Sequence, residues 1–289
     1  MRKGFVYVSV GICAFMATSF AGCNDRHEKY ADAKRYAIGA FTGDVSAVKR
    51  VEIDWIGGSI DVEQSVDGEL SFSEETPSEI EAQRACWYLD GSVLRIRYCK
   101  SGYDGKIRDG NKHLQIELPA GLGLDVETKR ASVTIGQAAF SSLAIESGSG
   151  NVSGEKWTCS GTTDIETGSA AVTVGEIKTR SLEIDGGSGD IKIERIYAPQ
   201  IQVETSGGRI DVGFAEKTEA ELESDSGSIT VRLLSGLGAS VRFETRQGKF
   251  YCEKAYEKSG GRYDVFGVDG ASRDCPIYVE TKNGDLYIQ

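Results

Sequence analysis

Acidic side chains recur at one position of an internal repeat, where they could bind cations or cationic ligands. Each of nine copies has an apolar anchor residue followed directly by Asp or Glu. Side chains alternate between the two faces of a strand, so carboxylates next to buried anchors would point outward and stack about 4.8 Å apart. The acidic column includes Glu146, Glu166, Asp185, Glu204, Glu223 and Glu244. It could bind divalent cations such as calcium or a cationic ligand, or it could be a solvated face that keeps the sheet from aggregating.

The spacing of the anchors predicts the fold. From Val126 to Leu222 successive anchors lie 19, 20, 19, 19 and 19 residues apart, and the next two steps are 21 and 36. A second apolar column follows seven residues after each anchor, and a third follows at twelve. One such unit cannot bury its own apolar face, whereas stacked units form a continuous core. We therefore predict an all-β protein, a parallel β-solenoid-like stack of two-strand rungs of about 19 residues. The anchors are Ile53, Val126, Ile145, Ile165, Ile184, Val203, Leu222, Phe243 and Val279.

Two further features of the repeat region are expected. Residues 68–119 depart from the repeat and form an irregular N-terminal β region, with strands near Leu70, Trp87, Val93 and Leu114. Glycine occupies the position five residues after the anchor in seven of nine copies, which indicates a corner with positive φ.

The start of the chain resembles an export signal. Two basic residues precede an apolar run from Gly4 to Phe20, which is short for a membrane span. The run ends in Phe20-Ala21-Gly22-Cys23, which resembles the lipobox of bacterial lipoproteins. We predict a signal peptide over 1–22, diacylglycerol on Cys23, a lipidated tether over 23–47 and a repeat domain over 48–289. A plain secretory signal with an incidental cysteine is the alternative.

An insertion over 253–274 interrupts the last step of the repeat. Cys252 and Cys275 bracket it, which predicts a disulfide that closes the loop, while the pairing of Cys86, Cys99 and Cys159 stays open. Long loops on rigid scaffolds often carry binding groups. The insertion could bind a ligand or cap the open end of the solenoid. Its candidate binding residues are Tyr256, Arg262, Tyr263 and Phe266.

Three segments together resemble a known bacterial family. They are VEIDWIGGSIDVEQ at residues 51–64, HLQIELPAG at residues 113–121, and the run of ETxxG-type rungs that follows. They are similar to bacterial candidate adhesins with β-strand repeats, a domain of unknown function, over about residues 36–289. The resemblance implies a β-solenoid-like fold, an envelope or surface location and, in some relatives, a link to envelope-stress systems. It implies no catalytic residues.

Composition narrows the function further. A net charge of −11 argues against nucleic acid, because phosphate binding draws on clustered Lys and Arg. The chain has two histidines and no GxSxG or P-loop motif. Two histidines are too few to favour a His-based catalytic triad or a histidine metal site. We expect a non-enzymatic surface lipoprotein without a cofactor, anchored to the bacterial membrane and facing outward. It would contact envelope polymers, glycans, host surfaces or a membrane protein. The alternatives are a component of envelope-stress sensing and a carboxylate-dependent polysaccharide lyase or hydrolase.

Overall fold

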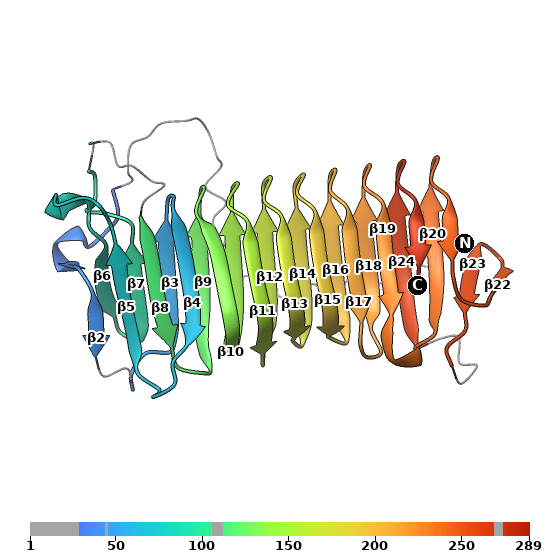
Figure 1. Cartoon of the computed structure of the whole chain (residues 1–289), viewed down its shortest axis with the longest axis horizontal. Helices are drawn as coiled ribbons and strands as arrows, with labels where there is room; N and C mark the ends of the chain where they lie inside the picture. The colour runs from blue at the N-terminus through green and yellow to red at the C-terminus, as the bar shows by residue number, and fades with distance from the viewer. Residues whose placement is uncertain (1–28, 44–45, 104, 106–111, 269–273) are drawn as a thin grey trace.

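The molecule is an elongated stack of β rungs, as the 19-residue repeat predicts. The computed structural model describes residues 29–43, 46–103, 105, 112–268 and 274–289, so the signal segment and Cys23 lie outside the described residues. Each rung contributes one strand to each of two facing sheets, and the rungs follow one another along the long axis (Figure 1). The prediction of a parallel, solenoid-like β fold is confirmed.

The first sheet carries the anchors. In spatial order its strands are β6 (Cys86–Asp90), β7 (Val93–Arg97), β3 (Arg50–Trp55), β9 (Leu122–Thr128), β10 (Ser132–Ser147), β12 (Thr162–Thr167), β14 (Ser181–Gly186), β16 (Gln200–Thr205), β18 (Glu219–Ser224), β24 (Cys275–Thr281), β20 (Ala239–Thr245), β23 (Arg262–Val265) and β22 (Tyr256–Ser259).

The second sheet carries the apolar column seven residues after the anchors. In spatial order its strands are β5 (Leu70–Glu75), β8 (His113–Leu118), β4 (Ser59–Gln64), β10, β11 (Val152–Cys159), β13 (Val172–Lys178), β15 (Ile191–Tyr197), β17 (Ile210–Phe214), β19 (Ile229–Leu233), β25 (Leu286–Ile288) and β21 (Phe250–Cys252). Strand β10 is long enough to pass through both sheets, so hydrogen bonding is continuous between them.

The predicted columns are in register. Ile145 pairs with Ile165, Ile165 with Ile184 and Ile184 with Val203, and all four side chains are buried. Because strands of parallel sheets pair residue by residue, equal spacing in the sequence places equivalent side chains on one line. The two inward columns form one continuous core along the stack.

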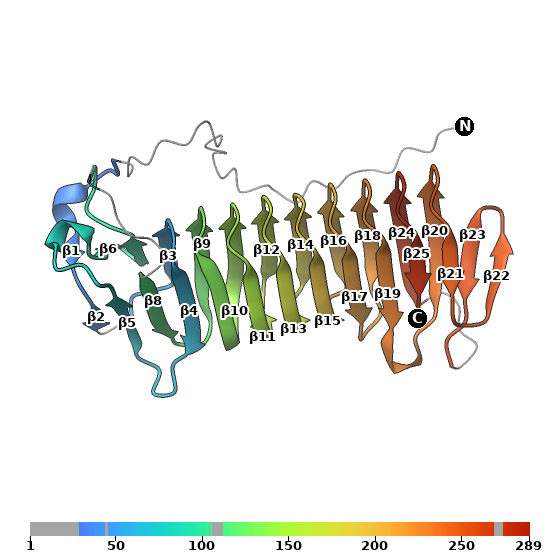
Figure 2. The same ribbon diagram turned by 45° about the horizontal axis from the view of Figure 1, so that its top comes forward.

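The order of rungs differs from the order of the sequence at the C-terminal end. The last rung, β24 with β25, lies between the β18–β19 rung and the β20–β21 rung. A short 3-10 helix, η4 (Leu234–Gly236), precedes β20. The insertion then forms the β22–β23 hairpin, which pairs with β20 and closes the end of the first sheet (Figure 2). The insertion therefore caps the end of the first sheet. The expectation that the rungs stack in sequence order is wrong at this end of the molecule.

The N-terminal end is also built out of sequence order. The β3–β4 rung lies between the β9–β10 rung and a rung made of β7 and β8, whose strands come later in the chain. Strands β5 and β6 add antiparallel outside it. The described residues from 68 to 119 thus form the irregular β region that the sequence predicts.

The segment expected to be a free tether is part of the fold from Tyr30 onward. Its elements are η1 (Ala33–Arg35), β1 (Ala37–Ile38) and β2 (Phe41–Gly43). Strand β1 pairs with β6, and β2 pairs with β5. The Tyr30 hydroxyl donates to the Cys99 carbonyl at 3.0 Å. The tether prediction is wrong for these residues because their few apolar side chains, Phe41 among them, pack on the end of the core.

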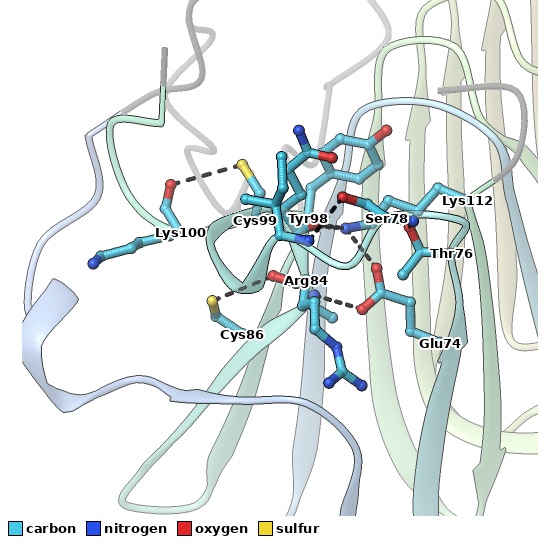
Figure 3. A network of polar contacts seen from close by, with 12 residues as sticks. Glu74, Thr76, Ser78, Arg84, Cys86, Tyr98, Cys99, Lys100 and Lys112 are labelled. Atoms are coloured by element: carbon cyan, nitrogen blue, oxygen red, sulfur yellow. Dashed lines mark hydrogen bonds and ion pairs between the residues drawn. The ribbon is translucent and has the colours of Figure 1, made fainter. Parts of the chain in front are cut away.

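A fully buried ion pair holds this end together (Figure 3). Lys112 Nζ lies 2.6 Å from Glu74 Oε1, and the two side chains are 1% and 2% exposed. The ammonium also donates to the carbonyl oxygens of Gln83 and Tyr98 and lies 4.3 Å from the Tyr98 ring centroid. Glu74 Oε2 accepts a 2.6 Å hydrogen bond from the Ala85 amide. Burial lowers the pKa of Lys112, and the Glu74 carboxylate opposes that shift. The network joins β5, β7, β8 and the segment around η2 (Glu81–Gln83).

The corner glycines are required for a steric reason. Among the corner glycines only Gly58 has a positive φ, of 91°, so the prediction of positive φ at this corner is wrong for the others. A Cβ added to Gly150, Gly189, Gly208 or Gly227 would lie 1.7 to 1.9 Å from a carbonyl oxygen of the neighbouring rung. Rungs stack at strand spacing, so the backbone at these four corners leaves no space for a side chain, whereas Ala131 and Ala170 occupy the same repeat position in two other rungs.

Candidate functional site

The carboxylate column exists as the sequence predicts and covers the outer face of the first sheet, here called the acidic face. Adjacent strands pair its members directly, so Glu146 faces Glu166, Glu166 faces Asp185, and the column continues to the end of the stack. The remaining pairs are Asp185 with Glu204, Glu204 with Glu223, Glu223 with Glu280 and Glu280 with Glu244. Like charges directly opposite one another on a sheet repel. A ligand with several positive charges would relieve that repulsion.

A second outward column runs beside it and contains a gap. It includes Asp125 on β9, Asp164 on β12 and Glu183 on β14, but the residue between Asp125 and Asp164 is Ala144 on β10. The missing side chain hollows the face into a groove of about 450 Å³. Parts of Val126 and Ile145 also line the groove, and Glu146 and Glu166 stand at its side. The groove is thus lined by carboxylates on both sides of Ala144.

Arginines close one end of the groove. Arg95 lies 2.7 Å from Glu52, and Arg97 lies 3.5 Å from Asp54, so both are paired with carboxylates of β3. Arg50 pairs with Asp125 at 2.9 Å. In contrast, Glu146 and Asp164 form no ion pair among the described residues. The carboxylates in the half of the groove over β10 and β12 therefore have no basic counter-ion among the described residues.

The groove carboxylates hold protons more tightly than ordinary carboxylates. Burial raises the pKa of Asp164, and the nearby charge of Glu183 raises it further. Burial and the charge of Glu166 raise the pKa of Glu146. For Asp125, burial raises the pKa although Arg50 opposes the shift. Along the column, burial and Glu204 raise the pKa of Glu223. A bound cation would reverse these shifts.

A pH dependence of stability follows. A carboxyl group whose pKa is raised on folding contributes stability when it is protonated, and this contribution is lost as pH rises through the folded pKa. We expect the free energy of unfolding to increase as pH falls from neutrality toward about 5. Urea denaturation across this range measures the effect. A variant with Glu146→Gln and Asp164→Asn should show a flatter profile than the wild type, and equal profiles would contradict the assignment.

No preformed metal centre is found in the described part of the chain, since no three Asp, Glu, His or Cys side chains converge at ligand distance there. The paired carboxylates of adjacent strands could still share a cation between two strands. Calcium binding stays a hypothesis.

Comparison with known proteins gives the family. The model of the Toastrack DUF4097 domain matches residues 48–289. The chain belongs to the Toastrack DUF4097 family. Among curated proteins, none matches the chain significantly. The resemblance drawn from the three sequence segments is confirmed.

Comparison with solved structures finds bacterial proteins of low sequence identity. A candidate adhesin from Bacteroides fragilis matches with 16% identity over 89% of this chain and 98% of that chain, with a TM-score of 0.51. A candidate adhesin from Parabacteroides distasonis matches with 12% identity over 87% and 97% of the two chains, with a TM-score of 0.49. One from Parabacteroides merdae matches with 14% identity over 91% and 99%, with a TM-score of 0.48. The Bacteroides fragilis match shows that its fold is shared with this Toastrack chain.

The predicted disulfide is absent from this Toastrack structure. Cys252 and Cys275 are both free thiols, as are Cys86, Cys99 and Cys159. The Cys275 thiol points to the Glu216 carbonyl at 3.8 Å, on the β18 side of β24, whereas Cys252 belongs to the rung on the other side of β24. The Cys252 thiol donates to the Lys254 carbonyl at 3.4 Å. The two cysteines lie on strands of different sheets, and the Cys275 thiol is directed away from the rung that contains Cys252.

The insertion residues divide between the cap and the surface. The Tyr263 ring stacks on Phe250 with centroids 3.8 Å apart, and Tyr256 contacts both rings. Phe250 and Tyr263 pack on the end of the core, whereas Tyr256 stays exposed beside them. Arg262 lies at the rim of a surface pocket, and Phe266 is half-buried beside the hairpin. None of the four lies on the groove of the acidic face.

Sequence reasoning missed Ala144 and the arginines at the groove end. The missing acid at Ala144 is visible in the alignment of rungs, as the one small residue between two aspartates. Arg95 and Arg97 could not be placed, because the β7–β8 rung is inserted out of order.

No helix in the described part of the Toastrack chain is long and apolar enough to cross a membrane.

Proposed function

We propose that the protein is a non-enzymatic binding module of the bacterial envelope, and that its acidic face binds ligands carrying several positive charges. The observation that carries this proposal is the carboxylate column, which runs in register from β9 to β20 with few basic partners near the groove. The net charge of −11 adds a long-range attraction for cations. The description of structural relatives as candidate adhesins agrees with a binding role.

The groove would be the strongest part of this surface. Glu146 and Asp164 both line the groove beside Ala144, as diagonal neighbours on β10 and β12, and neither has an ion-pair partner among the described residues. A single ammonium or guanidinium group bound there would contact both carboxylates. The rest of the column would then guide an extended ligand along the stack. Amino-sugar polymers and basic protein segments have the required charge pattern. A flat strip of carboxylates suits extended ligands better than a small substrate, which supports a non-enzymatic role.

The export signal and the lipobox-like sequence support a location at the membrane surface. In this proposal a lipid on Cys23 anchors the chain, and two or more acyl chains are enough for stable attachment. The anchor is tested by Cys23→Ala. We expect this variant to lose fatty-acid labelling and to leave the membrane fraction; retention of both would contradict lipidation.

Binding is tested by sedimentation of the full chain with isolated cell walls. A groove variant carries Glu146→Gln, Asp164→Asn and Glu166→Gln. Its control carries Glu155→Gln, Glu194→Gln and Glu253→Gln, which remove the same charge from exposed positions off the acidic face. We expect the groove variant to bind about tenfold more weakly and the control to bind as the wild type does. Equal losses in both variants would show that only net charge matters. Release of reducing ends from wall polysaccharide by the wild type would contradict the non-enzymatic role.

A further inference from the structure

The hairpin cap leaves part of the last long strand uncovered (Figure 1). Strand β23 pairs with β20 only from Ala239 to Arg242, whereas β24 pairs with β20 over its full length to Thr245. No described strand pairs with the outer edge of β20 from Phe243 to Thr245. An open strand edge presents backbone N–H and C=O groups that can pair with another extended chain.

A pocket lies at this open edge. It has a volume of about 640 Å³, and its lining comes from the end of β20 and from the hairpin tip. The lining residues are Arg242, Phe243, Glu244, Ser259, Gly260, Gly261 and Arg262. Phe243 is the anchor of its rung, yet it is only half-buried, unlike the fully buried anchor Val279 of the next rung. The pocket therefore offers an apolar surface that no described side chain covers completely.

Two arginines face each other across the strands at the inner end of the pocket. Arg242 and Arg262 are directly paired residues, and their side chains are 67% and 48% exposed. Like charges directly opposite on a sheet destabilise it. Arg242 contacts Glu244 at 2.5 Å through one nitrogen, and Arg262 contacts Asp264 at 3.4 Å through Nε. Each guanidinium has five N–H donors, so both retain donors for a carboxylate.

We propose that this edge binds the carboxyl-terminal segment of a partner polypeptide in extended conformation. A peptide that runs in the direction of β23 would pair with β20 from Thr245 toward Phe243 and would end where β23 begins, at Arg262. Its terminal carboxylate then meets the Arg242 and Arg262 guanidinium groups. A residue opposite Phe243 points to the same side of the sheet as Phe243, so an apolar terminal side chain packs on that ring. This site lies at the end of the acidic face, where the two share Glu244, and it does not depend on the function proposed for the groove over β10 and β12.

The test is fluorescence anisotropy with the full chain in detergent and a labelled peptide, Gly-Thr-Thr-Val-Val, with a free carboxyl end. We expect binding that weakens about tenfold or more when the peptide is amidated at its C-terminus, because the charge-assisted hydrogen bonds are lost. The double variant Arg242→Gln with Arg262→Gln should show the same loss. The control Arg209→Gln removes an exposed arginine from a distant corner and should bind as the wild type does.

Methylation of the last amide nitrogen of the peptide tests the strand pairing, since it removes a backbone donor. We expect this peptide to bind about tenfold more weakly than the unmethylated one. Absence of binding by the free-acid peptide, or equal binding of acid and amide, would overturn the proposal. Competition by galacturonic acid oligomers, with no effect of methylation, would also overturn it and would indicate a site for acidic sugars.

Discussion

Replacement of Lys112 by methionine is expected to destabilise the protein by about 3–5 kcal/mol, because the Glu74 carboxylate would stay buried without its counter-ion. Glu74 is 2% exposed, and water cannot replace the lost ammonium. The variant also loses the hydrogen bonds to the Gln83 and Tyr98 carbonyl oxygens. Urea denaturation of the full chain measures the change in the free energy of unfolding. Because the network joins the N-terminal strands, this end should unfold first.

An exposed pair provides the matched control. Lys282 and Asp225 are also 2.6 Å apart, but their side chains are 51% and 54% exposed. Exposed ion pairs contribute about 0–1 kcal/mol, so Lys282→Met should have little effect. The double variant Glu74→Leu with Lys112→Met should recover much of the loss, since two apolar residues remove the unpaired charge. If Lys112→Met costs no more than Lys282→Met, the buried pair does not hold this end together.

Replacement of Gly208 by alanine is expected to cost about 3 kcal/mol or more. The new Cβ would lie 1.9 Å from the carbonyl oxygen of Gly189 in the neighbouring rung, and that atom belongs to the backbone. Relief of the clash requires adjacent rungs to separate at the corner, which strains the ladder on both sides. Thermal and urea denaturation measure the loss.

The adjacent glycine is a close control. A Cβ at Gly207 meets only Ser226 Oγ, at 3.7 Å, and Gly207 is exposed. We expect Gly207→Ala to change stability by no more than about 0.5 kcal/mol. Similar costs for both substitutions would mean that loss of chain flexibility, and not the contact between rungs, explains the regular spacing of glycine along the repeat.

The sequence was sufficient for the middle of the stack because register follows directly from equal spacing. Ile145, Ile165 and Ile184 align in the structure as they do in the repeat. The corner was only partly predictable. Glycine was expected there for positive φ, but the actual constraint comes from the neighbouring rung, which a single repeat does not contain. A hydroxyl two residues after the anchor also supports the corner, as where Thr205 Oγ1 accepts from the Gly208 amide at 3.1 Å. The Ser or Thr at that position was a usable signal.

The ends of the stack were not predictable from spacing. The step from Phe243 to Val279 shows an insertion, but it does not show that the later rung packs inside the earlier one. The predicted pairing of Cys252 with Cys275 failed because the spacing does not show that β21 and β24 belong to different sheets. The Lys112 network was equally hidden, because Glu74 and Lys112 come from segments without the repeat. The acidic column was predictable, whereas the groove at Ala144 depends on neighbouring strands.

Carboxylate footprinting tests most directly whether the acidic face is the binding surface. The full chain would be labelled with a carbodiimide and an amine, with and without isolated cell walls, and modified residues would be quantified by mass spectrometry. We predict that walls protect Glu146, Glu166, Asp185 and Glu204, while the exposed control residues Glu155 and Glu194 stay as reactive as before. Protection of Glu155 and Glu194 with unchanged labelling of the acidic column would contradict the proposed function.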